Sequence, residues 1–292
     1  MRKNAAILVA LVLLASAMVF SSENIKVGNA ADEEIYQGDL ILNGDNVTVI
    51  ENKVFHINGS IIVEENATLI LRNAWINFTQ TSSNQFNMTF RNPANGNPRF
   101  IVENGNITAN GYALDIFFFG NSTATVDELK VDDFIAVFPY LYSLVKISNS
   151  KLFHLHPVGW ASLEITNSSI YTLYTQEYVE INVTNSEIST LLLVQGNSTA
   201  YISNCLIEQG EIRDSSKCYI YDSVLNTGSA YNYSTVWLVN TTVTAPGYVS
   251  DYATVYISWY LDVHVTDFAG QAVPGANVTA YDLDDTVAES KL

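Results

Sequence analysis

A six-residue phrase recurs along the chain at a nearly constant interval. It reads ISNSKL at 147–152, ITNSSI at 165–170 and VTNSEI at 183–188. With its asparagine taken as position zero, the position recurs every 18 or 19 residues, at Asn149, Asn167, Asn185, Asn204, Asp222 and Asn240. A period of this length indicates a repeat fold, in which each unit is a short supersecondary element that packs on its neighbours.

Three positions around position zero are apolar in all six units. They lie four residues before it (Val145, Leu163, Ile181, Ala200, Cys218, Val236), two before it (Ile147, Ile165, Val183, Ile202, Ile220, Leu238) and three after it (Leu152, Ile170, Ile188, Ile207, Leu225, Val243). In the first three units the pattern continues six residues after it, at Leu155, Leu173 and Leu191. The alternation before position zero predicts a strand with one buried face. Asparagine then favours a sharp left-handed bend, and a second strand follows.

Units of this kind bury their apolar faces only by stacking on one another. The sequence therefore predicts an all-β fold, a single-stranded parallel β-helix with coils of about 18 residues. A left-handed β-helix of hexapeptides would place apolar residues six apart, which these positions do not do, so we expect the right-handed form. A β-sandwich is the rival fold, but it would not keep this register over six units.

The repeat extends upstream with less regular spacing. Asn73, Asn104 and Glu128 fit position zero, with loops bulging from the coil near 79–98 and 109–123. Residues 40–62 are expected to form one or two opening strands. We expect the β-helix to span 31–258.

We expect the column at position zero to be an internal ladder, in which each side chain bonds to the bend of its neighbour. Asn167 and Asn240 would then carry no glycan despite their Asn-x-Ser/Thr sequons. Cys205 and Cys218 lie one residue after and four residues before position zero in successive units. At those places their Cα atoms are expected to be too far apart for a disulfide.

The N-terminus has the three parts of an export signal, which we assign to 1–30. Arg2 and Lys3 are followed by apolar residues 5–14 and by small-residue cleavage sites at 15–17 and 28–30. An uncleaved anchor running to Phe20 is the alternative. Secretion or display at the cell surface agrees with sequons that we take as glycosylation candidates, at Asn46, Asn58, Asn66, Asn87, Asn121, Asn197 and Asn232. A net charge of −17 argues against nucleic acid as a partner.

The repeated Asn-Ser phrase, the 18-residue coil and the export signal resemble secreted right-handed β-helix proteins of the pectin-lyase-like superfamily, especially archaeal surface proteins. The resemblance covers roughly residues 40–258. In the segment 259–292 the period is lost. That segment resembles the first hairpin of an immunoglobulin-like or carboxypeptidase-regulatory-like sandwich, so it is either the start of such a domain or an end cap.

The resemblance implies that polysaccharide lyase or hydrolase chemistry should be sought, although none of the superfamily's catalytic phrases is present. Two charged stretches are the candidates: Asp127, Glu128, Lys130, Asp132 and Asp133, and Glu208, Glu211, Arg213, Asp214 and Lys217. We interpret both as solvated loop charges. Asp133, His154 and His156 form a weak candidate metal site. We therefore assign no catalytic residue and expect no cofactor.

An aromatic column three residues before position zero is the most informative surface feature. Lys146, Glu164 and Asn182 hold this position in early units, and Tyr201, Tyr219, Trp237 and Tyr256 hold it later, with Tyr221 nearby. Because the neighbouring positions face inward, the column should face outward. It is a candidate surface for a glycan or for docking of another body; a stiffening ladder is the alternative.

Three functions remain open from the sequence. The first is a non-catalytic, exported structural or adhesive protein of the cell surface with a rigid β-helix rod. The second is a carbohydrate-binding module that uses the aromatic column. The third is a polysaccharide lyase or glycoside hydrolase, for which the fold alone is a poor argument. Partners are expected to be glycans or other surface proteins.

Overall fold

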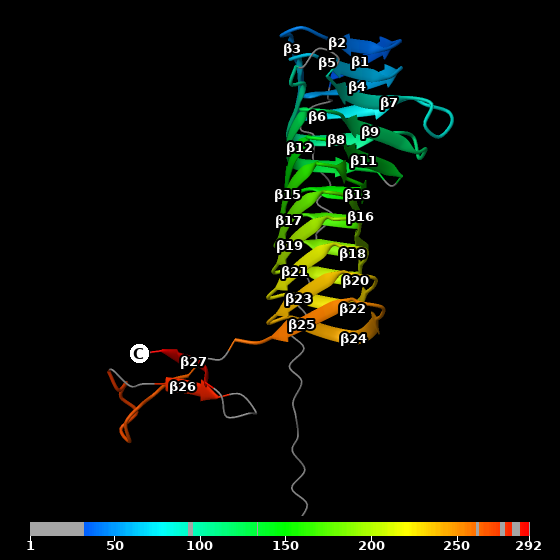
Figure 1. The fold of residues 1–292 in the computed structure, drawn as a ribbon. Helices are drawn as coiled ribbons and strands as arrows, with labels where there is room; N and C mark the ends of the chain where they lie inside the picture. Colours follow the sequence, from blue (N-terminus) through cyan, green and yellow to red (C-terminus); the bar gives the residue numbers. More distant parts are fainter. Residues whose placement is uncertain are drawn as a thin grey trace, which may run out of the picture. The chain divides into compact units, whose positions relative to one another are not determined.

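The computed structural model describes residues 32–92, 96–132, 134–260, 263–274, 278–281 and 287–291. From β1 (Asp32–Gln37) to β25 (Thr254–Ser258) the chain forms a right-handed parallel β-helix, whose coils stack along one axis (Figure 1). The fold class expected from the repeat is confirmed. Within these residues no helix is long and apolar enough to span a membrane. The predicted signal segment 1–30 lies outside the described residues.

The coils contribute strands to three parallel stacks. The first stack holds β3 (Val47–Glu51), the beginnings of β6 (Thr68–Phe78), β8 (Arg99–Thr108) and β10 (Thr123–Val131), then β12 (Leu144–Ser148), β15 (Ser162–Thr166), β17 (Glu180–Thr184), β19 (Thr199–Ser203), β21 (Lys217–Tyr221), β23 (Thr235–Val239) and β25. The second holds β1, β4 (Lys53–Asn58), the ends of β6, β8 and β10, and the beginnings of β13 (Lys151–Leu155), β16 (Ser169–Glu177), β18 (Glu187–Val194), β20 (Leu206–Ile212), β22 (Val224–Ala230) and β24 (Thr242–Val249). The third holds β2 (Leu40–Leu42), β5 (Ile61–Glu64), β7 (Asn87–Arg91), β9 (Leu114–Phe118), β11 (Ile135–Pro139), β14 (Val158–Gly159) and the ends of β13, β16, β18, β20, β22 and β24.

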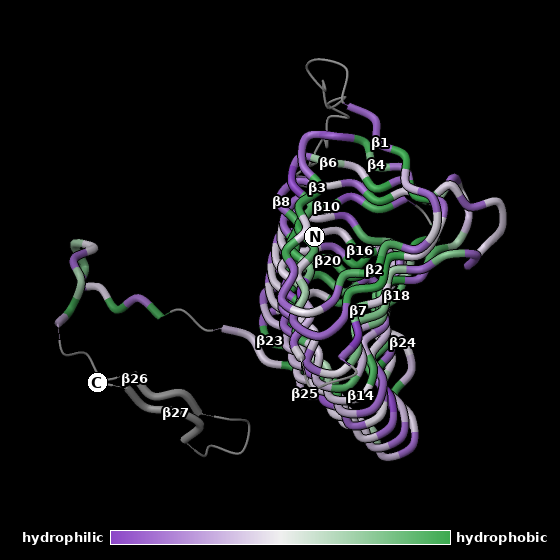
Figure 2. Tube along the Cα trace, turned by 90° about the horizontal axis from the view of Figure 1, so that it is seen from above, coloured by the Kyte–Doolittle hydropathy of each residue, from purple (hydrophilic) through white to green (hydrophobic). Residues whose placement is uncertain are grey.

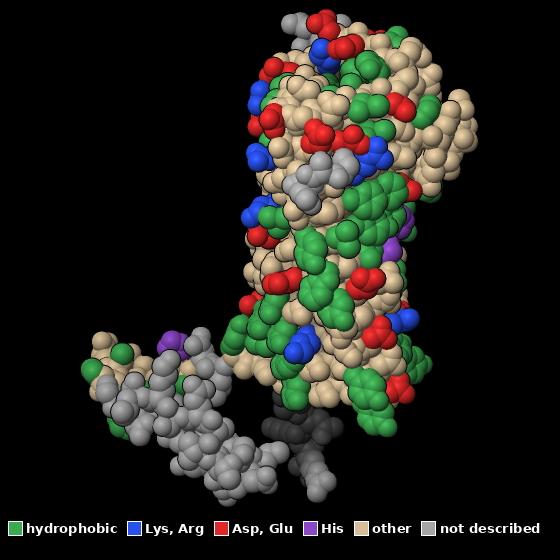
Figure 3. Space-filling view, turned by 45° about the horizontal axis from the view of Figure 1, so that its top comes forward, with side chains coloured by type: hydrophobic (Ala, Val, Ile, Leu, Met, Phe, Trp, Pro, Cys, Tyr) green, Lys and Arg blue, Asp and Glu red, His purple; other side chains and the backbone are tan. Residues whose placement is uncertain are grey.

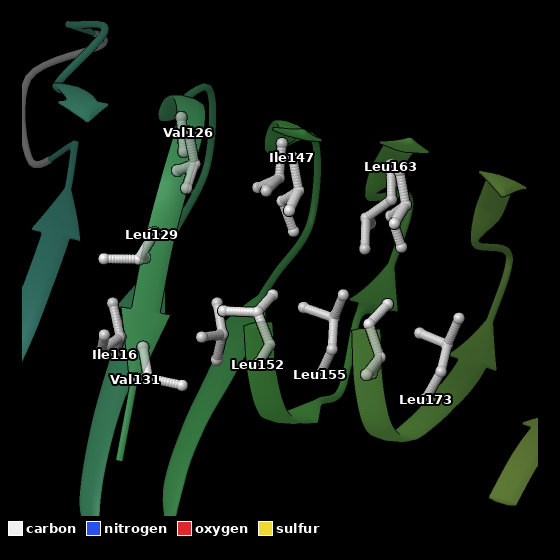
Figure 4. Packing of buried hydrophobic residues seen from close by; sticks show 14 of the residues in the cluster. Ile116, Val126, Leu129, Val131, Ile147, Leu152, Leu155, Leu163 and Leu173 are labelled. Atoms are coloured by element: carbon white, nitrogen blue, oxygen red, sulfur yellow. The ribbon is translucent and has the colours of Figure 1, made fainter. Parts of the chain in front are cut away.

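The interior of the coils is filled by the apolar columns that the sequence predicts. The residues four and two before the bend are all buried, as are those three after it except Val243, which is partly buried in the last coil. In Figure 4, Val126, Ile147 and Leu163 from one side and Leu129, Leu152 and Leu155 from the other project between the strands. Viewed along the axis, successive coils overlie one another (Figure 2). Each coil therefore buries its apolar side chains against its two neighbours.

The bend between the first and second stacks follows the first-stack strand of each coil. It uses the left-handed backbone conformation in every coil from β3 to β23. Its φ is 50° at Asn149, 49° at Asn185 and 48° at Asp222. The same column continues upstream with positive φ at Asn52, Asn73, Asn104 and Glu128. The predicted bend is confirmed, and so are the three upstream zero positions. Asparagine adopts this conformation at lower cost than most residues.

The expected internal asparagine ladder is wrong, because the residues at position zero are exposed. Asn149, Asn167, Asn185, Asn204, Asp222 and Asn240 all lie at the surface. Some still bond along the column: the Asn240 amide donates to Asp222 at 2.7 Å, and the Asn104 amide donates to Asn73 at 3.1 Å. The left-handed conformation turns the side chain outward, so the next residue faces inward instead. Burial therefore gives no reason for Asn167 and Asn240 to escape glycosylation.

The internal ladder is made by the residue after the bend. This column holds Ser150, Ser168, Ser186, Cys205, Ser223 and Thr241, all buried. The Ser186 hydroxyl donates to the carbonyl of Thr184 at 2.7 Å and accepts the backbone N–H of Ser168 in the previous coil at 3.1 Å. Ser168 repeats this arrangement with Ser150. The four serine hydroxyls thus close their own bends, and each satisfies a buried donor one coil away, whereas the Thr241 hydroxyl lies 3.0 Å from the carbonyl oxygens of Val239 and Ile220.

Two local expectations need correction. The segments 79–98 and 109–123 contain strands β7 and β9 of the third stack, so they are not simply loops outside the coil. Leu191 is half-buried, and Leu192 occupies the core instead. The cause is a register shift between Ile188 and Leu192, which absorbs the extra residue of the 19-residue coil.

The two cysteines and the C-terminal segment complete the description. Cys205 and Cys218 are free thiols, as expected from their positions in successive coils. Both are buried, and burial raises the pKa of Cys218 to about 12. After β25 a turn is present at Asp267, whose carboxylate accepts the backbone N–H groups of Ala269 and Gln271. β26 (Val278–Tyr281) and β27 (Val287–Lys291) pair antiparallel.

Replacing Ser186 by alanine tests the hydroxyl column. The variant should lose about 1–3 kcal/mol of unfolding free energy, because the buried N–H of Ser168 loses its acceptor. Urea unfolding followed by circular dichroism measures the loss. Ser189→Ala, which changes a half-buried serine outside the column, is the control and should lose much less. Equal losses in the two variants would contradict the role of the column.

Candidate functional site: aromatic columns on the outer surface

The aromatic column predicted on the first stack forms a continuous stack of rings. Ring centroids are 5.0 Å apart between Tyr201 and Tyr219, 4.3 Å between Tyr219 and Trp237, and 5.5 Å between Trp237 and Tyr256. The interplanar angles are 8°, 7° and 17°. The parallel register places these four residues directly one above another. We refer to them as the first-stack column.

The stacking limits what the first-stack column can bind. Because each inner ring is covered on both faces by its neighbours, the column presents ring edges to solvent along its length. A flat ligand that needs a ring face can use only an end of the column. At one end stands Tyr201, which is 40% exposed and lies in register with Asn182. Tyr221 is half-buried in an adjacent outward position of β21. The binding role of these residues stays a prediction.

A second aromatic group lies on the third stack and was missed by the sequence analysis. Phe117 and Phe138 are 5.3 Å apart, and His156 stacks on Tyr174 at 4.2 Å. Tyr140 extends the group sideways and stacks on Phe119 at 5.0 Å with an angle of 7°. Figure 3 shows hydrophobic side chains gathered in patches on the coil surface, with acidic side chains between them. The signal was available, since Phe117, Phe138, His156 and Tyr174 follow one another at intervals of 21, 18 and 18 residues.

The proposed ligands of a metal do not come together in the described residues. His154 contacts the rings of Phe153 and Tyr171, whereas His156 lies between Phe138 and Tyr174. Burial lowers the pKa of both histidines, and a hydrogen bond with Gln176 partly offsets this at His156. Asp133 lies outside the described residues. Within the described ranges no group of three metal-ligating side chains is present.

The two charged stretches bond mainly along the coil axis. Asp127 accepts hydrogen bonds from Asn149 and Ser148, which hold the pKa of its carboxyl below the usual range. Asp214 accepts the amide of Asn232 and the backbone N–H of Gly196. Glu128 is itself a bend residue with a φ of 54°. These contacts give the carboxylates of Asp127 and Asp214 a structural role. Asp127, Glu128 and Lys130 lie in β10, so the expectation of loop charges is wrong for them.

Glu208 and Glu211 also have polar partners. Glu208 accepts the amide of Asn226 at 2.6 Å, and Glu211 pairs with Arg213. Arg213 lies over the ring of Tyr231, 5.3 Å from its centroid. The stretch 208–217 is thus tied to neighbouring coils and does not converge on one point.

A shallow cavity of about 270 Å³ opens beside strands β13, β16 and β18. Phe153 and Tyr171 stack at 4.6 Å on one side of it, and Lys151, Ser169 and Ser189 supply polar groups. Tyr171 is 43% exposed, and the small Ser189 follows it in the next coil. An exposed aromatic ring beside an ammonium and hydroxyl groups can accommodate a sugar ring.

No family model and no curated protein matches the chain. Among solved structures, the crystal structure of a periplasmic alginate epimerase matches at 10% sequence identity, over 78% of each chain, with a TM-score of 0.40. A match with these values supports no conclusion about the function of this chain. The assignment of this chain as a parallel β-helix rests on its own strand registers.

The half-buried position of His156 within its ring stack predicts acid sensitivity. Its pKa is lowered in the folded protein, so between that value and the ordinary one of about 6.5 the unfolded chain binds the extra proton. Stability should therefore fall as the pH drops below about 6.5 and level off below the folded pKa. In His156→Phe, whose ring can stay in the stack, the loss between pH 7 and pH 5 should be smaller than in the wild type. The control is His264→Phe; identical pH profiles for wild type and His156→Phe would contradict the account.

Proposed function

We propose that the protein is an exported, non-catalytic structural or adhesive protein of the cell surface, with its β-helix as a rigid spacer. The main support is that polar contacts run along the axis and tie coil to coil. Lys53 pairs with Glu34 at 2.7 Å, and Lys146 pairs with Glu164 at 2.7 Å. Arg72 reaches Glu103 at 2.6 Å. Such exposed pairs are individually weak. Together with the hydroxyl column they connect neighbouring coils, so these charged side chains serve the stacking of the coils.

The sequence supports the location. The export signal assigned to 1–30, the many sequons and the net charge of −17 all fit a surface exposed to the cell exterior. Acidic and hydroxyl-rich exteriors keep such proteins apart from one another in solution. The fold itself is compatible with many functions, so the proposal depends on this distribution of contacts.

Glycan binding is the second candidate, and the cavity beside Tyr171 favours it. There one face of the Tyr171 ring is covered by Phe153 and the other lies towards Ser189, and Lys151 of β13 also lines the cavity. This surface fits a sugar ring better than the middle of the first-stack column, whose faces are covered. An adhesive spacer that also holds a glycan would combine the two candidates.

Incubation with a panel of acidic and neutral polysaccharides, including alginate, tests the absence of catalysis. We expect no change in polymer length, no unsaturated product and no epimerised residues after prolonged incubation. Any of these products, lost on substitution of a carboxylate of the coils, would contradict the proposal.

Retention on the same polysaccharides after immobilisation tests the second candidate. If a glycan binds at the cavity, Tyr171→Ala should abolish retention with unchanged circular dichroism. Trp237→Ala serves as the matched control on the first-stack column. Loss of retention in Trp237→Ala alone would move the binding surface to that column, and no retention of the wild type would remove this candidate.

A further inference from the structure

The sequon asparagines divide into two groups by what their side-chain amides do. Most donate to a neighbouring acceptor: Asn46, Asn58, Asn66, Asn77, Asn167, Asn232 and Asn240. Among the described residues, the amide nitrogens without such a bond belong to Asn87, Asn106, Asn121, Asn182 and Asn197. A sugar attached to Nδ2 breaks no hydrogen bond of the amide nitrogen at these sites. Asn106 is excluded, because its amide oxygen is enclosed by protein.

Three members of the second group lie in register with an exposed tyrosine ring. Asn182 of β17 is the direct partner of Tyr201 in β19. Asn197 follows Tyr178 by one coil, since Glu180 pairs with Thr199 two residues later. Asn121 precedes Tyr142 by one coil, as Thr123 pairs with Leu144. The three neighbouring rings are 40%, 48% and 65% exposed at Tyr201, Tyr178 and Tyr142.

Two of these rings have one face covered and one face directed to the sequon. Tyr178 stacks on Trp160 at 4.4 Å with an angle of 5°, so its other face lies towards Asn197. Tyr201 stacks on Tyr219, so its other face lies towards Asn182. Adjacent coils are about 4.8 Å apart, which is the spacing of rings in the columns. The space beside each asparagine therefore has the thickness of one further ring.

We propose that Asn121, Asn182 and Asn197 carry N-linked glycans, and that the first sugar at Asn182 and at Asn197 lies on the free face of the tyrosine one coil away. The sugar continues the column in the place that the next aromatic ring would take. Its C–H face meets the apolar ring face, while its hydroxyls stay in water. The exposed rings of these columns are thereby covered, which reduces the apolar patch.

The attachment follows the usual chemistry of a sequon in an exported chain. The amide nitrogen attacks C1 of an oligosaccharide carried on a phosphorylated lipid, and the N–C1 bond forms as the C1–O bond breaks. The electron pair leaves with the phosphate oxygen of the lipid, and the amide nitrogen loses one proton to a base of the transferase. The hydroxyl of Thr123, Thr184 or Thr199 completes each sequon.

Occupancy is measured first, by glycopeptide mass spectrometry on the full chain secreted from a host that attaches N-linked glycans. We expect glycan at Asn121, Asn182 and Asn197. An unmodified Asn182 and Asn197 in the secreted protein would overturn the proposal.

A double-mutant cycle then tests the stacking. Thr199→Ala removes the glycan at Asn197 without changing the asparagine and should lower the melting temperature by about 2–4 °C. In a Tyr178→Ala background the same change should have little effect. Thr199→Ser keeps the sequon and controls for the threonine methyl group. Asn87→Gln, at a sequon whose amide nitrogen is also unbonded and whose register partner is Asp115, controls for loss of a glycan that has no tyrosine ring beside it.

Equal shifts for Thr199→Ala in both backgrounds would overturn the stacking, as would a shift of the same size in unglycosylated protein made in bacteria. A fall in melting temperature for Asn87→Gln as large as that for Thr199→Ala would do the same. The result is independent of whether the protein acts as a spacer, because occupancy and ring contact are read directly.

Discussion

The left-handed bend between the first and second stacks is the constraint on which the rest of the structure depends. It recurs once per coil, from Asn52 to Asn240, at φ values between 45° and 61°. Because the bend falls at the same place in each coil, the strands before and after it remain in register over the whole stack. Only in that register does a hydroxyl such as Ser186 reach the N–H of the coil before it. The same register places the buried apolar side chains of successive coils in columns.

Much of this architecture could be predicted from the sequence. The period gives the coil, and the apolar positions around Asn149 give the two strands and their inward faces. The sequence did not reveal which member of the Asn-Ser pair points inward, since both recur and both bond locally. Alternation fails at a left-handed residue, which turns its own side chain outward. Leu191 was misplaced for a related reason: a bulge in β18 has no signature beyond one extra residue.

The outer surface was harder to predict because its residues are free of the packing that fixes the core. The first-stack column was visible as tyrosine and tryptophan at one position, but its face-to-face stacking became clear only from the ring geometry. The third-stack group was missed, since its members differ in type and include His156. The outer columns also lie next to sequons. Tyr201 is the end of the first-stack column, and Asn182 holds the same position one coil earlier. Function in a β-helix lies on this variable exterior, whereas the interior serves the fold.

Hydrogen exchange of individual backbone amides tests the central claim most directly. The N–H groups of Ser150, Ser168 and Cys205 lie just after a bend, yet each donates to a hydroxyl in the next coil, at 3.2, 3.1 and 3.0 Å. We predict that they exchange as slowly as the amides of the flanking strands β15 and β17. Exchange of these three amides at the rate of exposed turns such as that at Asp214 would contradict the account.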